Sequence, residues 1–81
     1  MPTVYVLDVP ENRPVVEVAS RDDRVAVRAV GPYTRLSSSA PIVIDRRETG
    51  CRHAVWYSCL AGLAAGRVVQ WDKNALRVEA S

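Results

Sequence analysis

The basic side chains that lead into an apolar segment are the part of this sequence best suited to bind a ligand. They are Arg46, Arg47, Arg52 and His53. If the apolar residues 54–66 form a helix, these cations surround the free N–H groups and the positive dipole end at its start, where an anion binds well. The nearby acids Asp45 and Glu48 are the simplest counter-charge, and a partner's carboxylate or a nucleic-acid phosphate is the alternative. The sequence therefore predicts a candidate anion or nucleic-acid site here.

Cys51 is the second group in this segment that could do chemistry. A helix N-terminus with Arg52 and His53 beside it would stabilise the thiolate form, as in reactive cysteines. Against this, cysteine is most often a small buried apolar residue, and Cys59 is too far away on the same helix to form a disulfide. A thiol-based enzyme that uses Cys51 is therefore the second alternative function.

Other catalytic or metal-binding patterns have less support. The spacing of Cys51, His53 and Cys59 matches no usual zinc site. Residues 37–39 are serines, but no nucleophile elbow surrounds them, and the paired acids at residues 22–23 are typical of a tight turn. We therefore expect no catalytic residue, no metal and no cofactor.

The apolar segment 54–66 is expected to be the only helix of the chain. It has few polar side chains, so more than one of its sides must be covered. A stripe of large side chains should pack on a sheet. A second stripe of small residues would let another backbone approach closely, either the chain's own N-terminal segment or a second copy in a homodimer. This candidate partner interface consists of Ala54, Ser58, Ala61, Gly62 and Ala65.

Basic residues on the predicted strands give another candidate surface for nucleic acid. Together they could follow a phosphate backbone. Acids are interleaved with them, however, which is typical of solvated strand faces, and the net charge is only +2. Nucleic-acid binding is therefore the first alternative rather than the leading function. The basic residues concerned are Arg24, Arg28, Arg35, Arg67, Lys73 and Arg77.

The elements that must position these residues are mostly strands. Apolar alternation and turn signals predict two hairpins, and β-branched or apolar runs predict further strands. The expected fold class is α+β, a mostly antiparallel sheet of five or six such short strands with one helix packed on it. The hairpins are residues 15–19 with 24–30 and residues 67–71 with 75–79, and the other candidate strands are residues 3–9, 33–36 and 42–44.

Length and composition predict one small folded domain over residues 1–81. With 48% hydrophobic residues the chain should fold, although 81 residues give only a thin core. The first residues do not resemble a leader and there are two cysteines, which predicts free thiols in the cytoplasm. The longest apolar run is shorter than the roughly 20 residues that cross a bilayer.

A chain this short, with no cofactor motif, has little room for an active site. We therefore predict a non-catalytic binding or regulatory protein that acts through contact with another protein or with itself. Accessory subunits, adaptors and inhibitors, including those carried by mobile elements, form this class.

Overall fold

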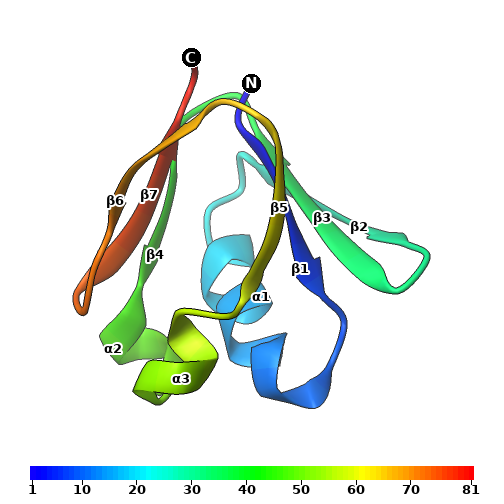
Figure 1. The fold of residues 1–81 in the computed structure, drawn as a ribbon. Coiled ribbons are helices and arrows are strands. Elements are labelled where there is room, and N and C mark those ends of the chain that lie inside the picture. Colours follow the sequence, from blue (N-terminus) through cyan, green and yellow to red (C-terminus); the bar gives the residue numbers. More distant parts are fainter.

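Seven β-strands form two antiparallel sheets, and short helices gather at one end of the molecule (Figure 1). In this computed structural model, which describes residues 1–81, one sheet has the strand order β2-β3-β1-β5 and the other β4-β7-β6. The strands are β1 (Thr3–Leu7), β2 (Val25–Val30), β3 (Tyr33–Ser38), β4 (Ile42–Asp45), β5 (Leu60–Ala65), β6 (Arg67–Trp71) and β7 (Ala75–Glu79). The helices are the 3-10 helix η1 (Pro10–Asn12), α1 (Arg13–Ser20), α2 (Arg46–Thr49) and α3 (His53–Trp56).

The expected α+β class with antiparallel strands is confirmed, but the arrangement differs from the prediction. Two sheets with seven strands replace the single sheet of five or six, and several short helices replace the one long helix. The predicted hairpin of β6 and β7 is present, and β2 is followed by an antiparallel neighbour, β3. Gly31 joins β2 to β3 with a φ of 57°, the left-handed value that glycine adopts without strain.

The segment 15–19, predicted to be a strand, lies in helix α1. Its valines favour strands by propensity, but Val15, Val18 and Ala19 recur at the helical i, i+3, i+4 spacing, and all three are buried. Pro14 suits the first turn of a helix, where an N–H has no partner within the helix to lose. The contacts of this apolar face with α2 and β4 therefore outweigh the strand propensity of valine.

The apolar segment 54–66 is not a single helix. α3 covers only its first turn, and the chain continues as β5, which pairs antiparallel with β1. The Ser58 hydroxyl donates to the carbonyl oxygen of Ala54 at 2.8 Å, a local bond that competes with helix continuation. The register against β1 shifts twice, which leaves Ala61 and Ala64 as extra residues at bulges. These bulges hide the two-residue alternation by which a strand is recognised in a sequence.

The core consists of small aliphatic side chains around one tryptophan. Trp56 is fully buried, and its indole Nε1 donates to the carbonyl oxygen of Asp72 at 2.7 Å. This bond fastens α3 to the turn between β6 and β7. The other buried apolar residues are Val4, Val6, Val15, Val18, Ala19, Leu36, Ile42, Ile44, Cys59, Leu76 and Val78.

The chain crosses from one sheet to the other at Gly66, between β5 and β6, near both chain termini (Figure 1). Its φ is 96°, and a Cβ on this residue would lie 2.5 Å from the carbonyl oxygen of Glu79 and 3.2 Å from the Cα of Pro2. Only glycine fits this crossing without moving the backbone of its neighbours.

Candidate functional site

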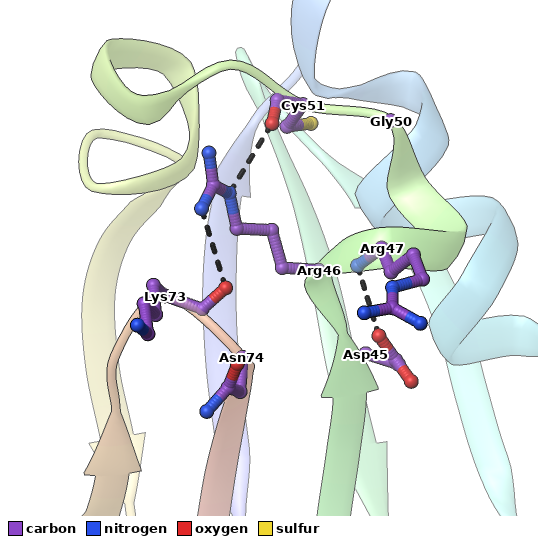
Figure 2. A pocket seen from close by; sticks show the side chains of 7 residues that line it. All are labelled: Asp45, Arg46, Arg47, Gly50, Cys51, Lys73 and Asn74. Carbon is purple, nitrogen blue, oxygen red and sulfur yellow. Dashed lines mark hydrogen bonds between the residues drawn. The ribbon is translucent and has the colours of Figure 1, made fainter.

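An open polar pocket of about 460 Å³ lies between α2 and the β6–β7 turn (Figure 2). α2 begins after Asp45, whose carboxylate accepts a hydrogen bond from the backbone N–H of Arg47 at 2.8 Å. It ends at Gly50, which has the left-handed φ of 67°. The pocket is lined by Asp45, Arg46, Arg47, Gly50, Cys51, Lys73 and Asn74. Arg46 and Arg47 are two of the four predicted anion-binding residues.

The Arg46 side chain in this pocket is bound to the protein's own backbone. Its Nε donates to the carbonyl oxygen of Cys51 at 3.3 Å, and a terminal nitrogen donates to the carbonyl oxygen of Lys73 at 3.2 Å (Figure 2). The guanidinium thus holds the loop after α2 against the β6–β7 turn. Arg47 and Lys73 are the exposed cations that remain, and Asp45 offsets one of their charges.

Arg52 and His53 lie outside the pocket, at the start of α3. The predicted helix entrance is divided between two helices, because Gly50 ends α2 before α3 begins. The ring of His53 meets that of Tyr57 edge on, with centroids 4.7 Å apart, and Tyr57 lies 5.9 Å from Trp71. His53 is therefore part of an aromatic cluster on the surface and does not join Arg46 and Arg47.

The two thiols are free and differ in exposure. Cys51 is partly buried at the pocket wall, whereas Cys59 is fully buried and its Sγ donates to the carbonyl oxygen of Trp56 at 3.0 Å. Burial raises the pKa of the Cys59 thiol to about 11, and the nearby Cys51 contributes to the increase. Cys59 is therefore a core residue. No group of three or more His, Cys, Asp or Glu side chains is gathered as metal ligands would be.

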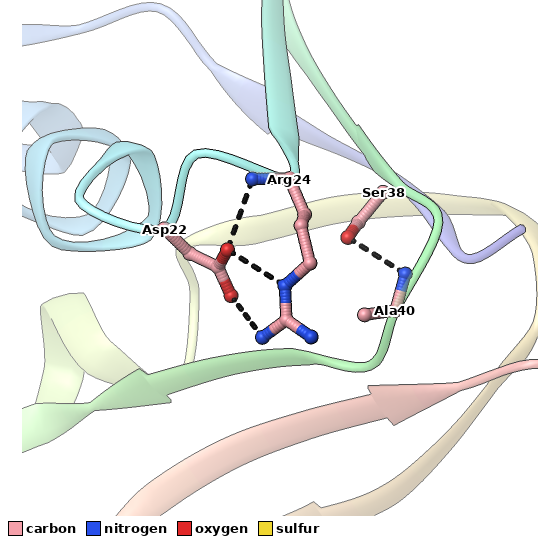
Figure 3. A network of polar contacts seen from close by, with 4 residues as sticks. All are labelled: Asp22, Arg24, Ser38 and Ala40. Atoms are coloured by element: carbon pink, nitrogen blue, oxygen red, sulfur yellow. Dashed lines mark hydrogen bonds and ion pairs between the residues drawn. The ribbon is translucent and has the colours of Figure 1, made fainter.

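The basic residues of the strands are spread over both sheets instead of forming one ribbon. Arg24 is neutralised by Asp22, whose carboxylate accepts from the guanidinium Nε at 3.0 Å and from a terminal nitrogen at 2.8 Å (Figure 3). Hydrogen bonds from Arg24 lower the pKa of Asp22 to about 2. On the other sheet, Arg77 pairs with Glu79 at 2.6 Å.

The predicted interface of small residues does not form one stripe, because its members belong to different elements. Gly62 and Ala65 are paired with Tyr5 and Thr3 of β1, so they share one face of the four-stranded sheet. Ala54 lies in α3, Ser58 in the turn after it, and Ala61 at a bulge of β5.

The outward face of the four-stranded sheet is a candidate surface that sequence reasoning missed. Directly paired residues point to the same side of a sheet, so Leu7, Tyr33 and Val30 form one outward row. These three side chains are 40%, 38% and 37% exposed, respectively. The adjacent row holds Tyr5 and two arginines. We call this surface the tyrosine face, and it consists of Tyr5, Leu7, Arg28, Val30, Tyr33 and Arg35.

The two tyrosines link the rows of this face. Tyr5 and Tyr33 are diagonal neighbours on β1 and β3, with ring centroids 6.2 Å apart and an angle of 72° between their planes. This edge-to-face geometry is favourable for aromatic pairs. The rings are therefore held by each other on the surface of the sheet.

The comparison with solved structures agrees with this architecture. No family model matches the chain, and no curated protein matches its sequence. A chain in the solved structure of a phenol hydroxylase–regulatory protein complex is similar in fold, with a TM-score of 0.80 and 14% sequence identity. The alignment covers 99% of this chain and 98% of that chain, so the two are nearly equal in length and similar throughout.

Exposed apolar side chains also occur at the strands β5 and β6, which are edge strands of the two sheets. We call Leu63, Val68 and Val69 the edge strip, and all three are exposed. Val69 lies at a register shift of β6 against β7, an irregularity that hinders pairing with a further strand.

No helix of the protein combines the length and the apolar character that a membrane crossing requires.

Proposed function

We propose that this chain is a non-catalytic regulatory protein that binds a hydroxylase and changes its rate. The observation that carries the proposal is the likeness in fold, over almost the whole of both chains, to a chain of the phenol hydroxylase–regulatory protein complex. A chain of 81 residues has little room for a hydroxylase active site. That complex consists of a hydroxylase and a regulatory protein. The role of the regulatory protein is therefore the one that suits this chain.

A non-catalytic protein regulates an enzyme through binding alone. It must bind one conformational state of the hydroxylase more tightly than another, and the ratio of the two affinities sets how far the equilibrium shifts. A tenfold ratio corresponds to about 1.4 kcal/mol. Tyrosine and arginine are enriched at protein interfaces, so the tyrosine face offers a suitable contact surface.

The distribution of charge favours a protein over a nucleic acid as the partner. Arg24 and Arg77 are paired with acids, and Arg46 donates to backbone carbonyls. Nucleic-acid binding depends on many cations that contact phosphates along one surface. The net charge is only +2, and the basic residues of the strands are spread over both sheets, so they do not provide such a surface.

The test is to use the tagged chain to capture proteins from cells of its source organism, and then to measure binding to the purified candidate partner. We expect mass spectrometry to identify a hydroxylase among the captured proteins, and we expect the purified hydroxylase to bind the chain in a saturable manner. Absence of saturable binding to the hydroxylase of the same cells would contradict the proposal. A concentration-dependent dimer without hydroxylase binding would instead favour self-association.

A further inference from the structure

We propose that the tyrosine face is the surface that docks on the protein partner, and that Arg28 and Arg35 bind carboxylates of that partner. This inference rests on the proposed function in that it requires a protein partner. It adds where the partner binds and which chemical groups it must present, namely Asp or Glu side chains beside an apolar patch.

Arg28 and Arg35 form an unfavourable pair in the free protein. They are directly opposite each other on β2 and β3, where paired Cβ atoms lie roughly 5 Å apart, and like charges at such positions destabilise a sheet. Neither side chain forms an ion pair, whereas Arg21, Arg24 and Arg77 each pair with an acid. The fold thus keeps two neighbouring cations without a counter-charge.

No acid shares the outward face with these arginines. Asp8 follows Leu7 beyond the end of β1, on the far side of the apolar row, where its backbone N–H donates to the carbonyl oxygen of Pro32 at 2.9 Å. A counter-charge must therefore come from another molecule, and a carboxylate matches the planar guanidinium with two parallel hydrogen bonds. The remaining outward positions are Thr3, Tyr5, Leu7, Ala26, Val30, Tyr33, Ser37, Gly62 and Ala65.

The apolar row beside the arginines identifies the partner as a protein. Leu7, Val30 and Tyr33 are partly exposed and uncharged, and covering them removes apolar surface from water. A protein surface can supply apolar groups and carboxylates together, and Tyr and Arg are common among the residues that dominate such interfaces. A nucleic acid binds mainly through its phosphates, so the apolar row would add little affinity and only two cations beside it could contact phosphates.

The decisive experiment measures affinity and thermal stability of the same variants. Arg28→Glu turns the like-charged pair into an oppositely charged pair and removes one binding site for a carboxylate. We expect its Tm to rise while its affinity for the purified hydroxylase falls by about tenfold or more, as for charges within an interface. The double variant Arg28→Glu and Arg35→Glu should bind at least as weakly, and wild-type binding should weaken as salt is added.

A charge-matched control reverses two arginines elsewhere. Arg13 and Arg52 are exposed and form no ion pair, so Arg13→Glu with Arg52→Glu changes the net charge by the same amount. Its affinity should stay within about twofold of wild type. If a charge reversal prevents folding, Arg28→Gln and Arg35→Gln remove the positive charges without adding negative ones and keep the test valid.

The outcomes separate this inference from the proposed function. Wild-type binding that is unchanged in the Arg28 and Arg35 variants contradicts the docking surface and leaves the proposed function in place. Loss of binding in the control variant, or in Leu63→Ser but not in Arg28→Glu, places docking on another surface of the protein and also contradicts the inference. Failure of the wild type to bind contradicts both. Arg28-dependent binding of a single-stranded oligonucleotide in place of the hydroxylase would identify a nucleic-acid surface and overturn the proposal.

Discussion

Tyr5 and Tyr33 meet edge to face on the outward surface of the four-stranded sheet, with ring centroids 6.2 Å apart. Aromatic pairs of this kind contribute about 0.5–1.5 kcal/mol beyond the area they bury. The rings therefore stay in place on the free protein, and less conformational freedom is lost when a partner covers them. Their position beside Arg28 and Arg35 makes this the most preorganised part of the tyrosine face.

Tyr33→Ala should weaken binding to the hydroxylase by about tenfold, because a buried aromatic contact of an interface is lost. The free energy of unfolding should fall by about 0.5–1.5 kcal/mol, the loss of the aromatic pair. Titration calorimetry and urea unfolding measure the two effects. Tyr57→Ala is the matched control, since Tyr57 is 37% exposed against 38% for Tyr33 but lies at the end of α3. Equal loss of affinity in both variants would argue against the tyrosine face.

Arg28→Glu should raise the free energy of unfolding by about 0.2–1 kcal/mol, because an opposite-charge pair replaces a like-charge pair across β2 and β3. The gain should shrink at high salt, where exposed charges are screened. The double variant with Arg35→Glu restores a like-charged pair and should return to about wild-type stability. Urea unfolding at low and high salt provides the measurement, and a destabilised Arg28→Glu would mean that the arginines do not repel each other.

Acid should destabilise the protein partly through Asp22. Hydrogen bonds from Arg24 lower the pKa of the Asp22 carboxyl from 3.8 to about 2 in the folded state. Because the folded-state pKa is depressed, the stabilisation is complete above about pH 4 and is lost as the pH falls towards 2. Asp22→Asn should flatten this part of the stability profile, measured by urea unfolding between these pH values. Asp23→Asn is the control, and an equal effect of both changes would contradict the role of the Arg24 pair.

Thiol labelling at pH 8 should modify Cys51 alone in the folded protein. Burial raises the pKa of Cys59 to about 11, so only roughly one Cys59 thiol in a thousand is ionised at that pH. Labelling with a chromogenic disulfide should therefore release about one equivalent quickly, and the second only after denaturant is added. In Cys51→Ser the fast phase should disappear. A fast phase that persists would show that Cys59 is accessible in the folded state.

Most of the strands can be predicted from the sequence, whereas the helices cannot. β2 and β7 carry alternating side chains and adjoin short turns, Gly31-Pro32 after β2 and a polar turn before β7, so local signals suffice for them. α1 is built from valines, and its helical spacing competes with their strand propensity over only two turns. β5 carries two bulges among small residues, so its alternation is broken. In α1 and in β5, tertiary packing therefore decided between helix and strand, which the local sequence does not distinguish.

The candidate surface shows a similar division. Alternation along residues 24–30 is enough to place Arg28 on the opposite side of its strand from Val27. That Arg35 lies directly opposite, and that Tyr5 stands beside it, depends on the register of β1, β2 and β3, which no single strand encodes. The grouping of Arg46 and Arg47 with Arg52 and His53 failed to form because Gly50 separates two short helices.

The central claim is that this chain regulates a hydroxylase by binding it. The most direct measurement is the rate of substrate hydroxylation by the hydroxylase purified from the same source, titrated with the wild-type chain and with the double variant Arg28→Glu and Arg35→Glu. The account predicts a saturable change in rate with the wild type, and the same change only at about tenfold higher concentration with the variant. A rate that stays constant up to a large excess of wild-type chain would contradict it.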